Sequence, residues 1–219
     1  MARFVVHSIP GSPCGRAVLA TLIEKGADFR FARVEPRSLK SPSHLALHPF
    51  GRVPVLEHDG LRLYETQAIL RYLDRVLESP SLTPEDARLA ARMDEIMGVS
   101  DWYLFQGVNN VIGFHRIVAP KLLGRVPDES AIAAAMPRAH TVVAELSRLL
   151  GDKEFLVTEQ LTLADFLVSA QMDMLAQTPE WLPLTAERLN LRGWLARINA
   201  RESLRATTWE CVEAMAEAA

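Results

Sequence analysis

The sequence predicts a small α/β domain followed by an all-helical domain. Strand-like segments occur before residue 78, a stretch with two prolines and two serines follows at 78–86, and helical periodicity dominates the rest. We expect the first domain to span residues 1–79 and the second to span residues 84–219. With 219 residues, 49% of them hydrophobic, the chain is large enough to bury a substantial core.

The first domain is expected to follow a β-α-β then β-β-α order. Segments 3–9 and 28–35 are predicted to be strands, and Asp59-Gly60 within 53–65 is typical of a hairpin turn between two short strands. Helices are predicted over 13–25, with Gly26 as the C-terminal cap, and over 66–77. The proline-containing segment 36–52 is expected to be irregular.

The second domain contains only helical patterns. Apolar periodicity predicts helices over about 84–118, 128–150, 162–177, 187–200 and 201–215. Gly98, Gly107 and Gly113 predict bends in the first of them. Thr162 and Asp165 have the spacing of a capping box ahead of an apolar run, so we expect that helix to be buried in its bundle.

Composition and charge exclude several functional classes. A net charge of −3 and dispersed basic residues argue against a nucleic-acid partner. The longest uncharged run is too short and polar to cross a membrane, and the N-terminus resembles a strand more than a signal peptide. The two cysteines, Cys14 and Cys211, lack the spacing of a disulfide framework or metal site. We therefore expect a cytoplasmic protein that holds no metal.

Ser12, Pro13 and Cys14 stand together at the start of the first predicted helix. Serine at the N-cap and proline at the next position favour a helix start, which needs no further function. The same serine hydroxyl could instead face a ligand. Cys14 could be a small buried residue, or a thiol whose pKa is lowered by the helix N-terminus. The local sequence leaves these alternatives open.

Two further pairs admit a structural and a functional interpretation. Pro54 within a strand pattern indicates either an edge strand or a cis bond, and Val53 could then offer free backbone groups to an extended peptide. Thr66 could cap its own helix. Together with Glu65 at that helix N-terminus, it could also hold the carboxylate and amine of an amino acid.

Four motifs in this order resemble the cytosolic glutathione transferase family: GSPCGRAVLATLIEKG, LALHPFGRVPVLEHDG, LYETQAILRYL and LTLADF. The pattern covers nearly the whole chain and implies a thioredoxin-like N-terminal domain followed by a helical-bundle domain that lines the electrophile site. Spacing is closest to the serine-using classes, such as phi, and to their bacterial relatives. No tyrosine stands at the end of the first strand, where His7 and Ser8 are found, so a tyrosine mechanism is not expected.

The resemblance assigns roles to individual residues. It places Ser12 as the hydroxyl that hydrogen-bonds the glutathione sulfur, Val53 as the backbone pair for the cysteinyl part, and Pro54 as a cis-proline. Glu65 and Thr66 would hold the γ-glutamyl end, and Lys40 and Arg52 the glycyl carboxylate. His44 has no firm counterpart and is expected to be an exposed loop histidine.

The resemblance therefore implies a dimeric enzyme that conjugates the glutathione thiolate to small, hydrophobic electrophiles, with glutathione as co-substrate. One alternative is a thiol transferase or reductase in which Cys14 forms a mixed disulfide with glutathione. The other is a scaffold of the same fold that binds a partner without chemistry. Identity of the electrophile is not readable from the sequence.

Overall fold

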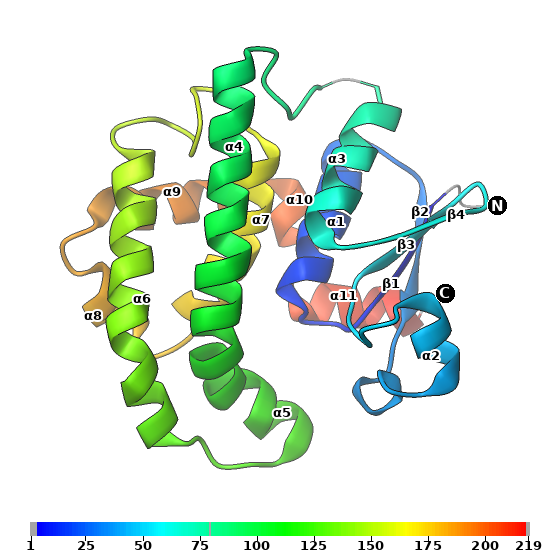
Figure 1. The fold of residues 1–219 in the computed structure, drawn as a ribbon, viewed down its shortest axis with the longest axis horizontal. Helices are drawn as coiled ribbons and strands as arrows, with labels where there is room; N and C mark the ends of the chain where they lie inside the picture. The colour runs from blue at the N-terminus through cyan, green and yellow to red at the C-terminus, as the bar shows by residue number, and fades with distance from the viewer. Residues whose placement is uncertain (1–3, 79, 218–219) are drawn as a thin grey trace. The chain divides into compact units, whose positions relative to one another are not determined.

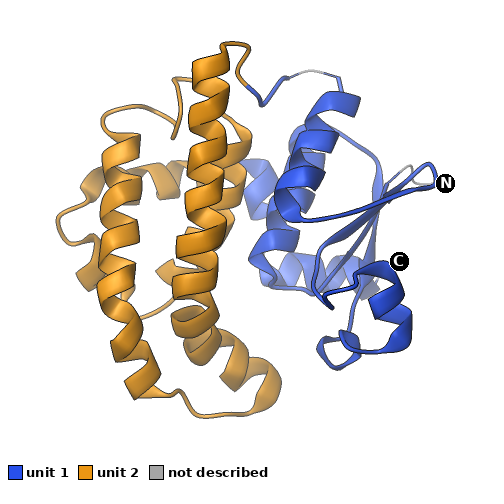
Figure 2. Ribbon diagram, viewed as in Figure 1, with its two compact units in different colours: residues 1–83, 199–219 blue, residues 84–198 orange. Residues whose placement is uncertain are grey.

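The computed structural model describes residues 4–78 and 80–217, which divide into two compact units. The first unit comprises residues 1–83 and 199–219, and the second comprises residues 84–198 (Figure 2). Arg3, where the first predicted strand began, and residue 79, where the first predicted domain ended, lie outside the described residues. The division differs from the expected one because residues 199–219 group with the first unit rather than with the helical one.

A four-stranded sheet of order β2-β1-β3-β4 forms the centre of the first unit. Its strands are β1 (Phe4–Ser8), β2 (Phe29–Arg33), β3 (Val55–His58) and β4 (Leu61–Tyr64). β1 runs parallel to β2 and antiparallel to β3, and the β3-β4 pair is the hairpin expected around Asp59-Gly60. Phe4, Val6 and Ser8 are buried in alternation along β1, as one face of a sheet covered by helices requires.

The two predicted helices of this unit are confirmed as α1 (Pro13–Glu24) and α3 (Thr66–Val76), which pack against each other (Figure 1). Gly26, at φ 63°, ends the first helix as expected. The segment 36–52 is more ordered than predicted, since it contains a 3₁₀ turn, η1 (Pro36–Ser38), and a short helix, α2 (Pro42–Leu47). Ser41 caps α2 by accepting a hydrogen bond from the His44 N–H at 3.3 Å.

The second unit is entirely helical in its described residues. The long predicted helix 84–118 is a continuous run of α4 (Ala87–Val99), a π-helical segment η2 (Ser100–Val118) and α5 (Ala119–Leu123). A backbone bond from the Ala119 N–H to the Phe114 oxygen shows the wider i to i−5 spacing. The remaining helices are α6 (Glu129–Leu150), α7 (Leu163–Ala176), α8 (Trp181–Thr185) and α9 (Leu189–Asn199). The short α8 was not predicted.

The expected capping box begins α7. Thr162 N and Oγ1 both donate to the Asp165 carboxylate, at 2.9 and 2.8 Å, and the helix behind them is buried along most of its length. Asp165 also accepts from the Leu156 N–H and the Trp194 indole, at 2.9 and 3.0 Å. Burial raises the pKa of this carboxyl, although the four hydrogen bonds oppose that effect.

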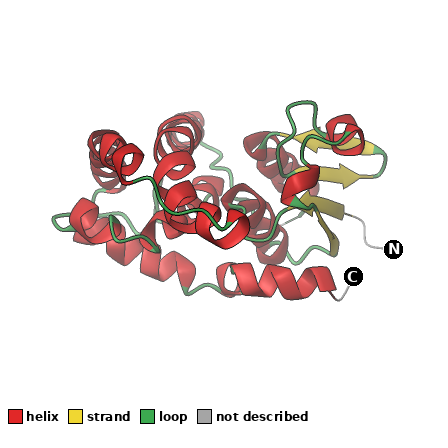
Figure 3. Cartoon of the chain, turned by 90° about the horizontal axis from the view of Figure 1, so that it is seen from below, coloured by secondary structure: helices red, strands yellow, loops and turns green. Residues whose placement is uncertain are grey.

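The C-terminal segment forms two short helices, α10 (Glu202–Arg205) and α11 (Trp209–Glu217), where one helix over 201–215 was expected. The first contacts α1 and the second contacts β2, so this segment lies against the sheet unit (Figure 3). No helix in the described part of the chain is long and apolar enough to cross a membrane.

Candidate functional site

Strand register brings three of the predicted site segments to one end of the sheet. His7, near the end of β1, pairs with Val55 at the start of β3, and Val55 pairs with Tyr64 at the end of β4. The chain therefore leaves β1 toward Ser12, enters β3 from Val53-Pro54 and leaves β4 into Glu65-Thr66 at the same end of the sheet. Val53-Pro54 is a cis peptide bond, as the resemblance implied.

Ser12 is the N-cap of α1, as its local sequence predicted. Its Oγ accepts a hydrogen bond from the Gly15 N–H at 3.2 Å, and its side chain is half-buried. A hydroxyl can accept this bond and still donate its own proton. Capping and ligand binding are therefore compatible at Ser12.

Cys14 lies in the first turn of the same helix, and its side chain is only 7% exposed. Cys211 is exposed, and both cysteines are free thiols. The burial of Cys14 fits a packed side chain better than an accessible nucleophile.

Glu65 and Thr66 form the strained start of α3. Glu65 has φ 73° and ψ 116°, a combination that is rare for a residue with a side chain. Its side chain makes no capping hydrogen bond to α3. Thr66, the first helical residue, is buried. Thr66 is therefore not the N-cap of its helix, and the prediction that it caps α3 is wrong. The N-cap residue, Glu65, leaves the first N–H groups of α3 without a side-chain cap.

The segment between α2 and β3 is held together by contacts to backbone carbonyls. Lys40 Nζ donates to the Phe50 oxygen at 3.0 Å, which leaves the ammonium two further protons to donate. Gly51 permits this approach, since its φ is 62° and a Cβ there would lie 2.5 Å from the Leu39 oxygen. Arg52 is exposed beside these groups.

His44 does not lie where it was expected. Its side chain is buried, at 4% exposed, within α2 rather than in an exposed loop. Nε2 donates to the Arg52 carbonyl oxygen at 2.9 Å, so the imidazole supports the backbone just before Val53. The sequence offered no signal for this contact because it joins a side chain of α2 to the backbone of a separate loop.

His48 is a buried residue of this region that the sequence analysis did not single out. It is 2% exposed, and its ring centroid lies 4.8 Å from that of Tyr64. Burial lowers the pKa of His48; Glu65 opposes this effect, while His44, Arg52 and Lys40 add to it. Three of the four groups whose charge acts on this buried ring, namely Glu65, Arg52 and Lys40, are predicted glutathione-binding residues.

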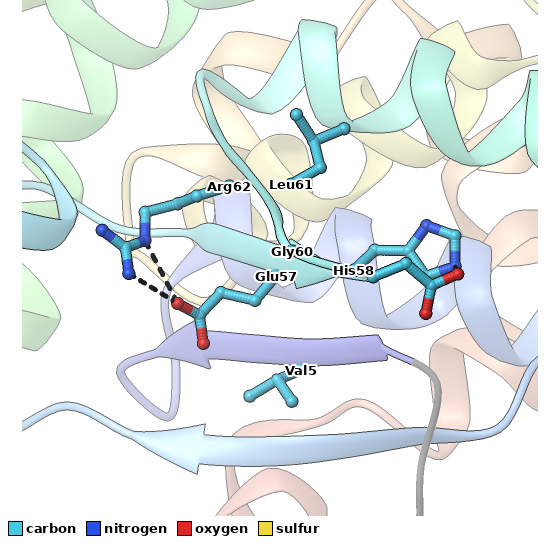
Figure 4. Close-up of a pocket in the computed structure, with 7 residues that line it drawn as sticks. Val5, Glu57, His58, Gly60, Leu61 and Arg62 are labelled. Atoms are coloured by element: carbon cyan, nitrogen blue, oxygen red, sulfur yellow. Dashed lines mark hydrogen bonds and ion pairs between the residues drawn. The ribbon is translucent and has the colours of Figure 1, made fainter.

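A separate hollow of about 490 Å³ lies at the β3-β4 hairpin and contains none of the predicted site residues (Figure 4). It is lined by Val5, Glu57, His58, Asp59, Gly60, Leu61 and Arg62. The Glu57 carboxylate bonds to His7 Nε2 at 3.0 Å and to Arg62 Nη2 at 2.9 Å, and both bonds lower its pKa. Glu57 thus links His7 on β1 to Arg62 on β4.

No group of three or more His, Cys, Asp and Glu side chains in residues 4–78 and 80–217 is arranged to hold a metal ion. The predicted site residues offer a hydroxyl, a helix N-terminus, a carboxylate and two basic side chains. This set suits a peptide with a free α-amino acid end and a further carboxylate.

Comparison with known proteins gives a consistent result. The chain matches the family model for the glutathione S-transferase N-terminal domain over residues 2–75 and the model for the C-terminal domain over residues 111–202. A glutathione S-transferase from Hyoscyamus muticus is 30% identical over 200 residues, covering 90% of this chain and 93% of that protein. Glutathione S-transferase 3 of Zea mays is 28% identical over 211 residues, covering 94% of both chains.

Among solved structures, glutathione transferase F7 from Populus trichocarpa superposes with a TM-score of 0.83 at 26% identity, covering 97% of this chain and 99% of that one. The expected thioredoxin-like N-terminal domain and helical C-terminal domain are thereby confirmed. With both domain models matched and relatives aligned along nine-tenths of its length, this chain belongs to the glutathione S-transferase family.

Proposed function

We propose that this transferase binds glutathione at this end of its sheet and uses the Ser12 hydroxyl to stabilise the glutathione thiolate. The observation that supports this proposal is the β1-β3-β4 register, from which the chain continues to Ser12, Val53-Pro54 and Glu65-Thr66 at the same end of the sheet. Ser12 combines a free hydroxyl proton with the N-terminus of a 12-residue helix, and both favour a negative charge nearby.

The remaining residues account for the other parts of the tripeptide. Glu65 would pair with the γ-glutamyl amine, while the α3 N–H groups and Thr66 would receive its carboxylate. Backbone groups of Val53, presented by cis-Pro54, would pair with the cysteinyl unit. Lys40 and Arg52, both exposed, would reach the glycyl carboxylate.

Ionisation of the thiol is the step that these groups assist. A free thiol has a pKa of about 8.5, and only the thiolate is a strong nucleophile. Ser12 donates a hydrogen bond to the sulfur, and the thiol proton leaves to solvent. The thiolate sulfur then attacks the electrophile, which either releases its leaving group as an anion or, where sulfur adds across a double bond, takes up a proton from solvent. Lowering the pKa by about one to two units corresponds to roughly 1.4–2.8 kcal/mol of preferential thiolate binding.

The electrophile and the assembly belong to the same proposal. We assign electrophile binding to the helical unit and expect small hydrophobic compounds, because its helices carry exposed aromatic side chains such as Trp102 and Tyr103, 74% and 56% exposed.

We also propose that the protein is a homodimer in the cytoplasm. Two free cysteines support a reducing compartment, and light scattering at catalytic concentrations tests the dimer.

The deciding experiment is a pH titration of the ultraviolet thiolate absorbance of bound glutathione in wild type, Ser12→Ala and Cys14→Ala. We expect a lowered thiol pKa in wild type and Cys14→Ala, and a rise of about one to two units in Ser12→Ala. If the pKa of the bound glutathione thiol is the same in Ser12→Ala as in wild type, the catalytic role of Ser12 is contradicted. Loss of thiol-transfer activity in Cys14→Ala, with the titration unchanged, would instead point to the mixed-disulfide chemistry.

A further inference from the structure

The loop that carries Ser12 is a tight turn. Ser12 N donates to the Ile9 oxygen at 3.0 Å across Pro10 and Gly11, and Gly11 has φ 82°. Proline at the second position, glycine with positive φ at the third and an i to i+3 hydrogen bond are the signature of a type II turn. The conformation of Gly11 therefore sets where Ser12 begins α1.

Trp209, the first residue of α11, packs directly on this turn. A Cβ built on Gly11 would lie 1.9 Å from Trp209 Cε3 and 2.3 Å from Cζ3, so the indole ring fills the space that a side chain at Gly11 would need. Gly11 is thus required twice, by its φ and by the ring against it. The local sequence does not predict this contact, because Gly11 and Trp209 lie about two hundred positions apart.

The segment carrying Trp209 is anchored to the helix that Ser12 begins. Arg16 Nη2 donates to the Leu204 oxygen at 3.1 Å, Ser203 Oγ donates to Glu24 Oε2 at 2.6 Å, and Arg201 also bonds to the Glu24 carboxylate. Beyond the indole, α11 contacts β2. Trp209 is therefore held on both sides by contacts within the same unit.

We propose that Trp209 is a positioning residue for the transferase reaction: its ring holds the Ile9–Ser12 turn so that the Ser12 hydroxyl meets the glutathione sulfur. This inference rests on the proposed role of Ser12. A hydroxyl that must donate to a developing thiolate loses effect when it is displaced by a fraction of an ångström. The C-terminal segment thus contributes to the chemistry without touching the substrate.

The test compares Trp209→Ala, Trp209→Phe and Val212→Ala in the full-length protein. Val212 is buried in the same helix, at 3% exposed, and serves as the control for a general loss of packing. In Trp209→Ala we expect the pKa of the bound glutathione thiol to rise by about one unit and kcat to fall about tenfold, with KM for glutathione within about twofold. Trp209→Phe retains a ring at this place and should restore most of both values.

A double variant separates this proposal from the role of Ser12. If Trp209 acts through Ser12, then Ser12→Ala combined with Trp209→Ala gives the same thiol pKa as Ser12→Ala alone. If Ser12→Ala by itself leaves the thiol pKa unchanged, the proposed function fails. If Ser12→Ala raises it while Trp209→Ala does not, or if Val212→Ala raises it equally, only the positioning role is overturned.

Discussion

Glu65 shows at the scale of one residue how this site departs from relaxed backbone geometry. A φ of 73° with ψ 116° costs about 1–3 kcal/mol for a residue other than glycine. The surrounding structure keeps that conformation because the strand before Glu65 and the helix after it are both fixed in the unit. The Glu65 carboxylate, which follows the end of β4, acts to raise the pKa of His48 against the larger lowering effect of burial.

We predict that Glu65→Gly separates stability from binding. Glycine adopts positive φ without strain, so the free energy of unfolding should rise by about 1 kcal/mol even after the entropy of the added glycine is counted. KM for glutathione should rise because the amine partner is gone. Urea unfolding and steady-state kinetics measure the two effects. Glu65→Gln, which keeps the strain, should raise KM without the gain in stability, and equal stabilities for the two variants would contradict the account.

At the scale of an element, α7 depends on the buried carboxylate at its start. Asp165 joins the loop at Leu156, the cap at Thr162 and the indole of Trp194, so one side chain fixes three segments of the helical unit. Each partner is a buried N–H that would otherwise lack an acceptor. The capping box is therefore more than a local helix signal.

Asp165→Ala should lower the free energy of unfolding by about 3 kcal/mol or more, since it leaves several buried donors unpaired. Asp173→Ala is the matched control: it removes an aspartate from the same helix, where the carboxylate accepts an exposed hydrogen bond from Gln177 Nε2 at 3.2 Å. We expect that control to cost less than about 1 kcal/mol. Denaturant unfolding of both variants checks the difference, and similar losses would count against the capping explanation.

At the scale of the whole molecule, the C-terminal segment of the chain belongs to the same unit as the N-terminal residues. Residues 199–219 follow the helical unit in sequence but group with the sheet unit, where Glu24 receives hydrogen bonds from Arg201 and Ser203. Burial would raise the pKa of Glu24, but these bonds outweigh it and lower the pKa below 4.5. Because the folded-state pKa is the lower one, the stabilisation is present above pH 4.5 and is lost as the pH falls through the folded value.

We therefore predict that the stability difference between wild type and Glu24→Gln depends on pH. It should be full near neutral pH and shrink progressively below about pH 4.5, because protonation removes from the wild type the charge that the variant already lacks. Thermal unfolding of both proteins across this range measures the difference. A gap that stays constant down to about pH 3 would show that the contact stabilises the C-terminal segment without its charge.

The sequence by itself determined the features that depend on neighbouring residues. Ser12-Pro13 begins α1, Asp59-Gly60 turns the hairpin and Thr162 with Asp165 caps α7, because turn and cap chemistry is set within three or four positions. The ordered motifs also identified the family and, with it, the predicted glutathione residues. Those residue roles remain predictions until the titration is done.

Only the tertiary structure decided what long-range packing controls. It buried His44 with its ring bonded to the Arg52 carbonyl oxygen, packed His48 against Tyr64 and placed Trp209 on Gly11. Each of these contacts joins segments whose approach depends on how the whole unit folds. Local propensity carries no information about such a partner, since burial is fixed by the elements that pack together and not by the residues next in sequence.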